Sequence, residues 1–548
     1  MEGRQKLFYN GSILTMAEGG KPQAVLTEGR RILAVGSFEE LRGMAGAGAE
    51  LRDLEGHTLM PAFIDPHSHF TACANSFLEA DLEGADSFDE IERRLRKFAG
   101  ENPPASGQWL RGGKYDQNEL AEGRHPTRAV LDQACPDCPA VISHQSGHMG
   151  VFNTKALKLL GVTGDTIAPE GGVIAMENGE PTGYMEEAAF VQYLQKVPMP
   201  APQDFLKAYE RAQEMYFSYG ITTAQEGMMT EAVGGLYRLL LASGLLKLDV
   251  TAYADLKAGH KLMEEFQDYT KGYRQHFRVG GYKMFLDGSP QGRTAWLRRP
   301  YERLSQGGSL APGGSSASDR EAGYRGYPVL DDETVYRNLK LAALEGRQIL
   351  THCNGDAACG QLLAQCERVE KEGLPLAAVR PVMVHAQMLG ADQMDELKRM
   401  GVIPSFFVAH VYHWGEIHVK NLGLFRAGAI SPAATALKKE ILFTFHQDSP
   451  VIRPDMMETV WCAVNRRTKS GRILGETERI PVYEALKAVT VNGAYQYFEE
   501  ETKGTIAPGK AADLMILEEN PLTAEPEDLK EIRVLETVKE GETVYRRK

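Results

Sequence analysis

Positive charge, long apolar runs and cysteine are all scarce in this sequence of 548 residues. The 74 Asp and Glu residues outnumber the 61 Lys and Arg residues, and the formal net charge of −13 argues against a nucleic-acid partner. No apolar run approaches the ~20 residues that a membrane helix needs, so we expect no membrane partner. The first residues also lack the apolar core of a signal peptide, which favours a cytoplasmic protein.

The seven cysteines are sparse and odd in number, which fits a reducing compartment. Cys135 and Cys138 form one CxxC motif, but no second pair of ligands at zinc-site spacing stands nearby. We therefore interpret this motif as a plain loop.

Short apolar runs alternate with helical segments through the middle of the chain. RVGGYKMFLDG (278–288) and RQILTHC (347–353) are typical of strands buried on both faces, whereas DETVYRNLKLAALEG (332–346) has helical periodicity. The alternation repeats about eight times. It favours an α/β fold built as a (β/α)8 barrel over a doubly wound sheet.

Both chain ends are rich in short strands and turns, so we expect residues 1–60 and 491–548 to form one small β domain together. The barrel domain would then span 61–490. Residues 71–210 are too long for one connection and predict an inserted α+β substructure over the barrel mouth. The Gly- and Ser-rich segment 305–327 lacks periodicity and is typical of a mobile loop.

Polar side chains stand at the ends of the predicted strands, where a barrel places its catalytic groups. Six such positions share this edge: His67, His69, Lys283, His352, His385 and Asp448. In MPAFIDPHSHF (60–70) the two histidines are two residues apart, so strand geometry points both rings to one face.

Each of these residues also has an ordinary structural explanation. A strand-end histidine is usually a satisfied polar residue, a strand lysine can extend its amine outward, and Asp448 can cap a helix. Six coincidences on one edge are improbable, so the set predicts a metal centre. Neutral imidazoles suit zinc, iron or manganese, and a lysine joins such ligands once carbon dioxide converts its amine to an anionic carbamate.

The same residues resemble the amidohydrolase superfamily, and the finer motifs resemble amidohydrolase family 3, the branch that includes N-substituted formamide deformylases. The motifs that carry the resemblance are FIDPHSH, YKMFLDGS, THCNGDAA, VHAQ, HQDSP, WLRGGKYD (109–116), HPTRAVLDQACPDCPAV (125–141), SGHMGVFNTKAL (146–157), PTGYMEE (181–187), DGSPQGRTA (287–295) and GTIAPGKAADLMIL (504–517). The resemblance implies a distorted TIM barrel with a small β-sandwich domain built from both termini.

The resemblance also implies roles for the six residues. His67, His69, Lys283 and Asp448 would bind one ion, most simply Zn2+, and a carbamate on Lys283 would share a second ion with His352 and His385. Asp448 would act as general base and then protonate the leaving nitrogen. His385 or His352 would polarise the carbonyl if a single ion is bound.

Departures from the family pattern, such as His446 and Gln447 before Asp448, remove none of the ligands and bear on the expected substrate pocket rather than on the metal centre. The residue pattern offers five substrate-binding candidates: His148, Arg293, His413, Trp414 and Trp109. Each has a structural alternative: His148 and Trp109 can belong to the insert's own packing, and Arg293 can pair with Asp287. His413 and Trp414 follow a strand and predict a wall suited to an aromatic or amphipathic substrate.

The function that these patterns predict is hydrolysis of a non-peptide carbon–nitrogen bond in a small molecule, such as an N-formyl or N-acyl amine. Deamination of a heterocycle, cleavage of an ester or carbamate, and a non-catalytic scaffold are the alternatives. Lys283 argues against the deaminase, and the complete set of ligands argues against the scaffold. A homodimer is the prior expectation for the oligomeric state.

Overall fold

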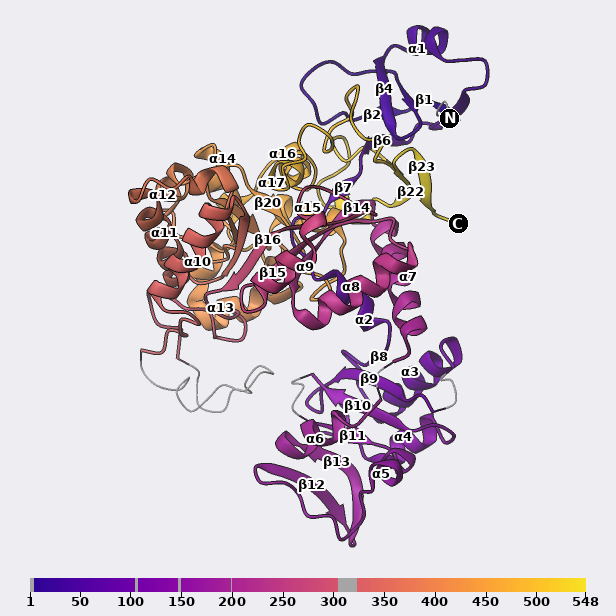
Figure 1. The fold of residues 1–548 in the computed structure, drawn as a ribbon, viewed down its shortest axis with the longest axis vertical. Helices are drawn as coiled ribbons and strands as arrows, with labels where there is room; N and C mark the ends of the chain where they lie inside the picture. Colours follow the sequence, from indigo (N-terminus) through magenta and orange to yellow (C-terminus); the bar gives the residue numbers. More distant parts are fainter. Residues whose placement is uncertain (1–3, 104–106, 146–148, 199, 304–322) are drawn as a thin grey trace. The chain divides into compact units, whose positions relative to one another are not determined.

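A computed structural model describes residues 4–103, 107–145, 149–198, 200–303 and 323–548 (Figure 1). These residues form two compact units. The large unit combines residues up to 72 with those from 212 onward, and the small unit spans 73–211. All six predicted metal ligands belong to the large unit.

Eight parallel strands form the central sheet of the large unit, in the order β20-β19-β18-β17-β16-β15-β14-β7. In chain order they are β7 (Phe63–Ile64), β14 (Ile221–Met229), β15 (Asp249–Asp255), β16 (Phe277–Phe285), β17 (Gln348–Cys353), β18 (Val382–His385), β19 (Ile403–Phe406) and β20 (Thr444–Phe445). Helices follow most of these strands, which is the alternation that the sequence predicts.

The helices of the large unit are α1 (Phe38–Met44), α2 (Phe70–Ser76), which runs on into the small unit, α7 (Pro202–Ser218), which begins there, α8 (Glu231–Ser243), α9 (Gly259–Glu265), α10 (Asp332–Glu345), α11 (Asp356–Lys371), α12 (Met394–Arg399), α13 (His410–Gly428), α14 (Ala433–Lys438), α15 (Met456–Asn465), α16 (Val482–Ala488) and α17 (Val491–Gln496). Sequence signals explain their ends. Asp331 caps the first turn of α10 by accepting from the Thr334 N–H, and Gly346 ends that helix in the left-handed conformation.

The sheet curls until the chain after its first strand meets the chain after its last. The backbone N–H of His69, beyond β7, donates to the carbonyl of Ser449, beyond β20, over 2.8 Å. One buried apolar cluster joins Ile64 of β7, Leu350 of β17 and Ile403 of β19 with Tyr497, just after α17. This arrangement confirms the predicted TIM-like α/β fold.

The chain ends contribute two further sheets. The first has the order β4-β3-β1-β5 and the second the order β2-β6-β21-β22-β23. Their strands are β1 (Gln5–Tyr9), β2 (Ser12–Ile13), β3 (Ala24–Glu28), β4 (Arg31–Gly36), β5 (Glu50–Asp53), β6 (Thr58–Pro61), β21 (Leu514–Leu517), β22 (Val534–Lys539) and β23 (Glu542–Arg546). A shared cluster of buried side chains, including Phe8, Val25, Leu514 and Val538, draws on both ends of the chain. The β-sandwich packing of these sheets stays a prediction.

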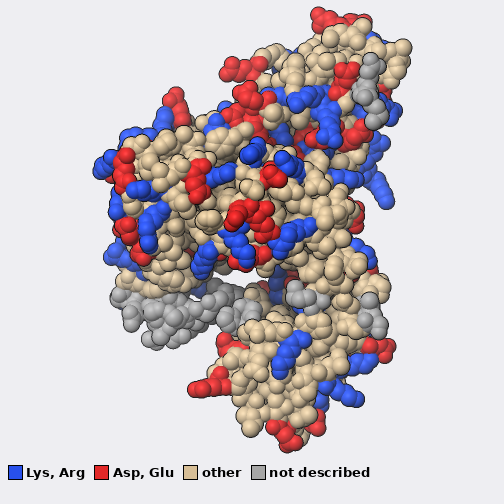
Figure 2. Space-filling model, in the orientation of Figure 1, with Lys and Arg blue, Asp and Glu red and all other residues tan. Residues whose placement is uncertain are grey.

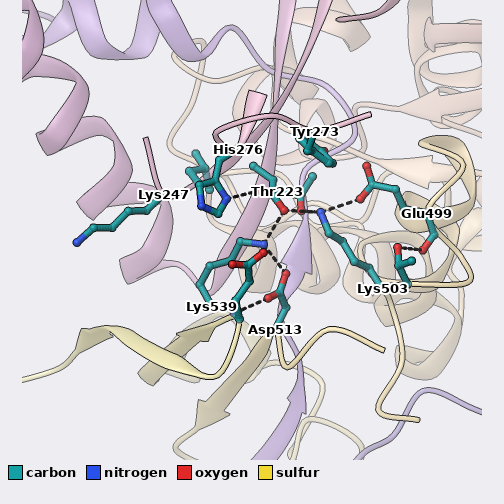
Figure 3. A network of polar contacts seen from close by, with 12 residues as sticks. Thr223, Lys247, Tyr273, His276, Glu499, Lys503, Asp513 and Lys539 are labelled. Atoms are coloured by element: carbon teal, nitrogen blue, oxygen red, sulfur yellow. Dashed lines mark hydrogen bonds and ion pairs between the residues drawn. The ribbon is translucent and has the colours of Figure 1, made fainter. Parts of the chain in front are cut away.

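A buried ionic network ties the C-terminal segments to the start of barrel strand β15 (Figure 3). Asp249, the first residue of β15, accepts from the amines of Lys503 and Lys539 at 2.6 Å each. Lys539 also lies 2.7 Å from Asp513, and Lys503 lies 2.7 Å from Glu499. Buried charges are tolerated only when they are paired in this way. We refer to five residues together as the base network: Asp249, Glu499, Lys503, Asp513 and Lys539.

The small unit is a six-stranded sheet with helices, in the order β12-β13-β11-β10-β9-β8. Its elements are β8 (Ala80–Asp81), α3 (Phe88–Glu101), β9 (Leu110–Tyr115), α4 (Arg128–Ala134), β10 (Ala140–His144), β11 (Met149–Phe152), α5 (Thr154–Leu160), β12 (Gly172–Glu177), β13 (Glu180–Glu186) and α6 (Glu187–Leu194). Ser87 caps α3, and Ile91 and Leu95, four residues apart, turn one face of that helix into the core.

The CxxC motif forms a disulfide, which the interpretation as a plain loop did not include. Cys135 ends α4, and a disulfide joins it to Cys138. The segment is a loop, as predicted, but the turn after the helix brings the two Cα atoms to 5.7 Å, a separation that suits a disulfide.

Figure 2 shows Lys and Arg side chains interspersed with Asp and Glu over the visible face. The excess of negative charge therefore does not gather into one patch on that face. Among the described residues, no helix combines the length and the apolar character that crossing a membrane requires.

Candidate metal centre

The six predicted ligands lie at the carboxyl ends of barrel strands. His67 and His69 follow β7, His385 is the last residue of β18, and Asp448 follows β20. Lys283 lies within β16, where the strand register pairs it with the interior residue Leu350 of β17. Because parallel strands end at the same edge, the fold brings together residues separated by up to several hundred positions.

Two of the candidate ligands, His67 and His69, lie close to one carboxylate oxygen of a third, Asp448. The Nε2 atoms of His67 and His69 lie 3.3 and 3.4 Å from Oδ1 of Asp448. The ligand atoms of these three residues all fall within 4.8 Å of one another, as binding of one ion would require. The Nζ of Lys283 lies 3.4 Å from Nε2 of His67, beside this group.

The other two histidines lie close to each other, and one of them approaches the second oxygen of Asp448. Nδ1 of His352 is 3.2 Å from Nε2 of His385, which in turn is 3.9 Å from Oδ2 of Asp448. The two oxygens of Asp448 thus face different groups of nitrogen atoms.

The donor set fits a divalent cation. Oδ1 of Asp448 is buried and has no hydrogen-bond partner among the described residues, although two imidazole nitrogens approach it. A buried carboxylate oxygen without a donor is costly unless a cation compensates its charge. Imidazole nitrogen and carboxylate oxygen are the ligand atoms that zinc and similar ions take.

Burial keeps the nitrogen ligands in the state that binds metal. Desolvation, together with the nearby Lys283, lowers the pKa of His67 well below its ordinary value and that of His352 to about 4. Both imidazoles are therefore neutral near pH 7. Burial also lowers the pKa of the Lys283 amine to about 8, against the opposing effect of Asp448. A larger fraction of this amine is neutral than in an exposed lysine.

A side chain of the neighbouring strand selects the nitrogen that His67 presents. Gln225 of β14 donates its amide to the carbonyl of Pro66 and to the hydroxyl of Tyr497, at 2.6 and 2.9 Å. Its oxygen therefore accepts from Nδ1 of His67, 2.6 Å away. With the proton on Nδ1, the lone pair of Nε2 faces Asp448 and Lys283.

Two of the ligands sit on strained backbone. His385 has φ of 72° and Asp448 has φ of 54°, in the left-handed region that residues other than glycine rarely adopt. Such a conformation costs on the order of 1–3 kcal/mol and is concentrated at functional sites.

Sequence reasoning assigned no supporting role to three buried polar residues near the candidate ligands. Gln225 and Glu226 stand inside the apolar run of β14, and Glu226 accepts from the backbone N–H of Thr71 over 2.8 Å. Asp287 accepts backbone N–H groups after β17 and lies 3.8 Å from Nε2 of His352. A buried polar residue late in an apolar strand is the signal that would have found the two β14 residues.

Two of the five predicted substrate contacts, Trp109 and Arg293, have other partners, and a third cannot be placed. His148 lies outside the described residues. Trp109 belongs to the small unit, where it packs edge-on against Phe152 in an apolar cluster. The guanidinium of Arg293 donates to the carbonyl of Glu302 and stacks over Tyr301.

His413 and Trp414 lie on α13, after strand β19. Nε2 of His413 is 2.9 Å from a carboxylate oxygen of Glu458. The ring of Trp414 lies 5.9 Å from that of Phe407, whose ring is 6.3 Å from that of His385. A row of packed aromatic rings, of which Trp414 is partly exposed, therefore adjoins the candidate ligands.

Known proteins show the same sequence pattern and fold. Residues 50–545 match the sequence model of the amidohydrolase family. YtcJ of Bacillus subtilis (strain 168), named as an amidohydrolase, is 28% identical over 562 residues that cover 98% of this chain and 99% of its own. The N-substituted formamide deformylase of Arthrobacter pascens is 27% identical, with 99% of both chains covered.

Among solved structures, an uncharacterized metal-dependent hydrolase from Pyrococcus furiosus superimposes with a TM-score of 0.74 at 26% identity. The match covers 95% of this chain and 100% of that chain. Together with the family match over most of the sequence, this likeness leads to one conclusion: the chain belongs to the amidohydrolase family.

Proposed function

We propose that the protein hydrolyses a non-peptide amide, an N-formyl or N-acyl amine, to a carboxylic acid and a free amine. The observation that carries the proposal is the position of Asp448, with one oxygen beside His67 and His69 and the other toward His385. A carboxylate placed there can serve both as ligand and as proton carrier. The likeness to a formamide deformylase, at 27% identity, supports this bond type over others.

A divalent ion, Zn2+ in this proposal, supplies Lewis acidity that polarises the carbonyl and lowers the pKa of water. Asp448 accepts the proton of the attacking water as the new C–O bond forms at the carbonyl carbon. When the C–N bond breaks, Asp448 gives this proton to the leaving nitrogen. The products are one carboxylic acid and one amine, so the base returns to its starting state.

His352 and His385 have two roles in the proposal. They either bind a second ion together with Lys283, or one of them polarises the substrate carbonyl when a single ion is present. The position of Lys283 supports the first role. A buried ammonium 3.4 Å from a ligand nitrogen would repel a cation, whereas the carbamate that forms with carbon dioxide would attract it.

The row of aromatic rings beside the ligands supports a substrate with an apolar or aromatic substituent. The ring of Phe407 lies 4.5 Å from that of His410, and the ring of His410 lies 4.5 Å from that of Trp414. Phe407 and His410 are buried, so Trp414, which is partly exposed, would pack against the group on the amide nitrogen while the carbonyl meets the metal centre.

Asp448→Asn tests the proposed reaction. We expect kcat for amine release from N-formyl and N-acyl amines to fall by about 10²–10⁴-fold, because an amide cannot carry the proton. Asp455→Asn is a matched control: Asp455 caps α15, and asparagine caps helices equally well. Full activity of Asp448→Asn, or no amine release from any such substrate by Zn2+-loaded protein, would contradict the proposal.

Metal stoichiometry tests the role of Lys283. In the presence of bicarbonate we expect about two ions per chain in the native protein and a marked loss in Lys283→Ala, as measured by elemental analysis. About one ion per chain in both proteins would show that Lys283 does not bind metal. In that case His352 or His385 would polarise the substrate carbonyl.

A further inference from the structure

A fifth histidine, His446, lies beside the candidate ligands and contacts residues of two barrel strands. It follows β20, is fully buried, and stands two residues before Asp448. Its Nε2 is 3.0 Å from Nδ1 of His385. Its Nδ1 is 2.8 Å from the hydroxyl oxygen of Ser405, a buried residue of β19. Both ring nitrogens of His446 therefore have a partner, one on each side.

Hydrogen-bond chemistry allows two proton arrangements along this chain. In the first, Nδ1–H of His385 donates to Nε2 of His446, and Nδ1–H of His446 donates to the Ser405 hydroxyl. In the reverse arrangement, Ser405 donates to His446, His446 donates to Nδ1 of His385, and the proton of His385 sits on Nε2. Only the first leaves a lone pair on Nε2 of His385.

The lone pair matters because Nε2 is the atom that His385 turns toward the other ligands. It lies 3.2 Å from Nδ1 of His352 and 3.9 Å from Oδ2 of Asp448. A nitrogen that carries hydrogen cannot bind a cation. Partners that accept from the second ring nitrogen of a histidine ligand orient the ring, and their loss weakens metal binding.

We propose that His446 and Ser405 are positioning residues that hold His385 in the orientation and tautomer required for metal binding. The inference rests on the proposed function, because it takes His385 as a ligand. It assigns a purpose to a residue that departs from the family pattern and that neither the ligand set nor the reaction uses. A space-filling role would need only the volume of the ring, whereas here both nitrogens are engaged.

Two substitutions of similar size separate these roles. In His446→Gln the amide oxygen can reach the place of Nε2 and still accept from His385, whereas His446→Leu fills the space without an acceptor. We expect the Zn2+ affinity of metal-free protein, measured by competition with a chelating dye, to fall about 10–100-fold in His446→Leu. We expect His446→Gln to stay close to the native protein and Ser405→Ala to lose affinity in the same direction as His446→Leu.

Thermal unfolding in the presence of chelator shows whether each variant is folded, and His385→Ala provides the reference for a lost ligand. Equal Zn2+ affinity of His446→Leu and native protein would overturn the inference, and so would equal losses in the Leu and Gln variants. If His385→Ala itself binds Zn2+ as the native protein does, then the assignment of His385 as a ligand fails, and the inference falls with that part of the proposed function.

Discussion

At the scale of single residues, the candidate metal centre depends on neighbours that decide which nitrogen each histidine presents. Gln225 shows this most clearly, because its amide is fixed by two acceptors, Pro66 and Tyr497, and its oxygen is left for His67. The ligand therefore has one tautomer before any ion arrives. Preorganisation of this kind avoids the free energy of reorienting the ring on binding.

Gln225→Leu should weaken metal binding while leaving all the ligands in place. Without the acceptor, Nδ1–H of His67 is buried and unpaired, and the proton can move to Nε2. We expect the dissociation constant for Zn2+ to rise about 10–100-fold, measured by titration of metal-free protein. Tyr497→Phe removes a neighbouring contact of Gln225 but not its bond to His67, so it should change the affinity far less. Similar losses in both variants would point to a general disturbance of the core.

The convergence of the candidate ligands could be predicted from the sequence, but the contacts of their neighbours could not. His67, His352 and Asp448 stand at the ends of apolar runs, and the barrel rule states that such ends converge. The partners of the ligands obey no local rule: Gln225 meets His67 across 158 residues, and His446 meets His385 across 61. These contacts follow from register and side-chain direction, which the sequence does not show.

At the scale of elements, the spacing between barrel strands sets the position of Lys283. Gly281 of β16 lies opposite Gln348 of β17, two residues before Lys283. A Cβ atom at Gly281 would come within 1.8 Å of the Gln348 carbonyl oxygen, which belongs to the backbone. The two strands can keep their register only because this position has no side chain.

Gly281→Ala should therefore destabilise the protein. Overpacking of a closed core costs about 1–3 kcal/mol, and the displaced strand should also carry Lys283 away from His67. Gly43→Ala is a control of the opposite sign: Gly43 lies in α1 with open space around it, where alanine favours a helix by roughly 0.5–1 kcal/mol. Denaturant titrations of both variants measure the difference. A Gly281→Ala protein as stable as Gly43→Ala would contradict this account of the strand spacing.

The sequence predicted the positions of the barrel strands better than the contacts between residues. Each apolar run singled out in the middle of the chain contains a barrel strand, because burial on both faces leaves a continuous apolar signature. The disulfide between Cys135 and Cys138 was missed, since three-residue spacing alone does not fix the turn that brings the sulfur atoms together. The base network was missed too, because its members are scattered from Asp249 to Lys539.

At the scale of the whole molecule, the base network makes stability of the barrel depend on the C-terminal segments. Asp249 belongs to a barrel strand, whereas Lys503, Asp513 and Lys539 come from the last part of the chain. None of these charges is tolerated in a buried position without its partners. The barrel strand and the chain end therefore have to be folded together.

This coupling predicts how stability depends on pH. The amines of Lys503 and Lys539 hold the pKa of Asp249 well below its ordinary value, despite the opposing effect of burial. The contribution of Asp249 is thus complete above the unfolded pKa of about 4 and is lost as the pH falls through the folded pKa. Its carboxylate raises the pKa of both amines, so their contribution is complete below about pH 10 and is lost as the pH rises further.

Asp249→Asn should remove the loss of stability at acid pH that protonation of Asp249 causes. At neutral pH we expect the free energy of unfolding to fall by about 3–5 kcal/mol, because two buried amines lose a shared carboxylate. As the pH falls below about 4, the Tm of the native protein should then approach that of the variant, since protonation of Asp249 has the same effect as the substitution. Asp137→Asn, at an exposed carboxylate, should follow the native curve throughout. Parallel Tm curves for Asp249→Asn and native protein over this range would show that the acid sensitivity arises elsewhere.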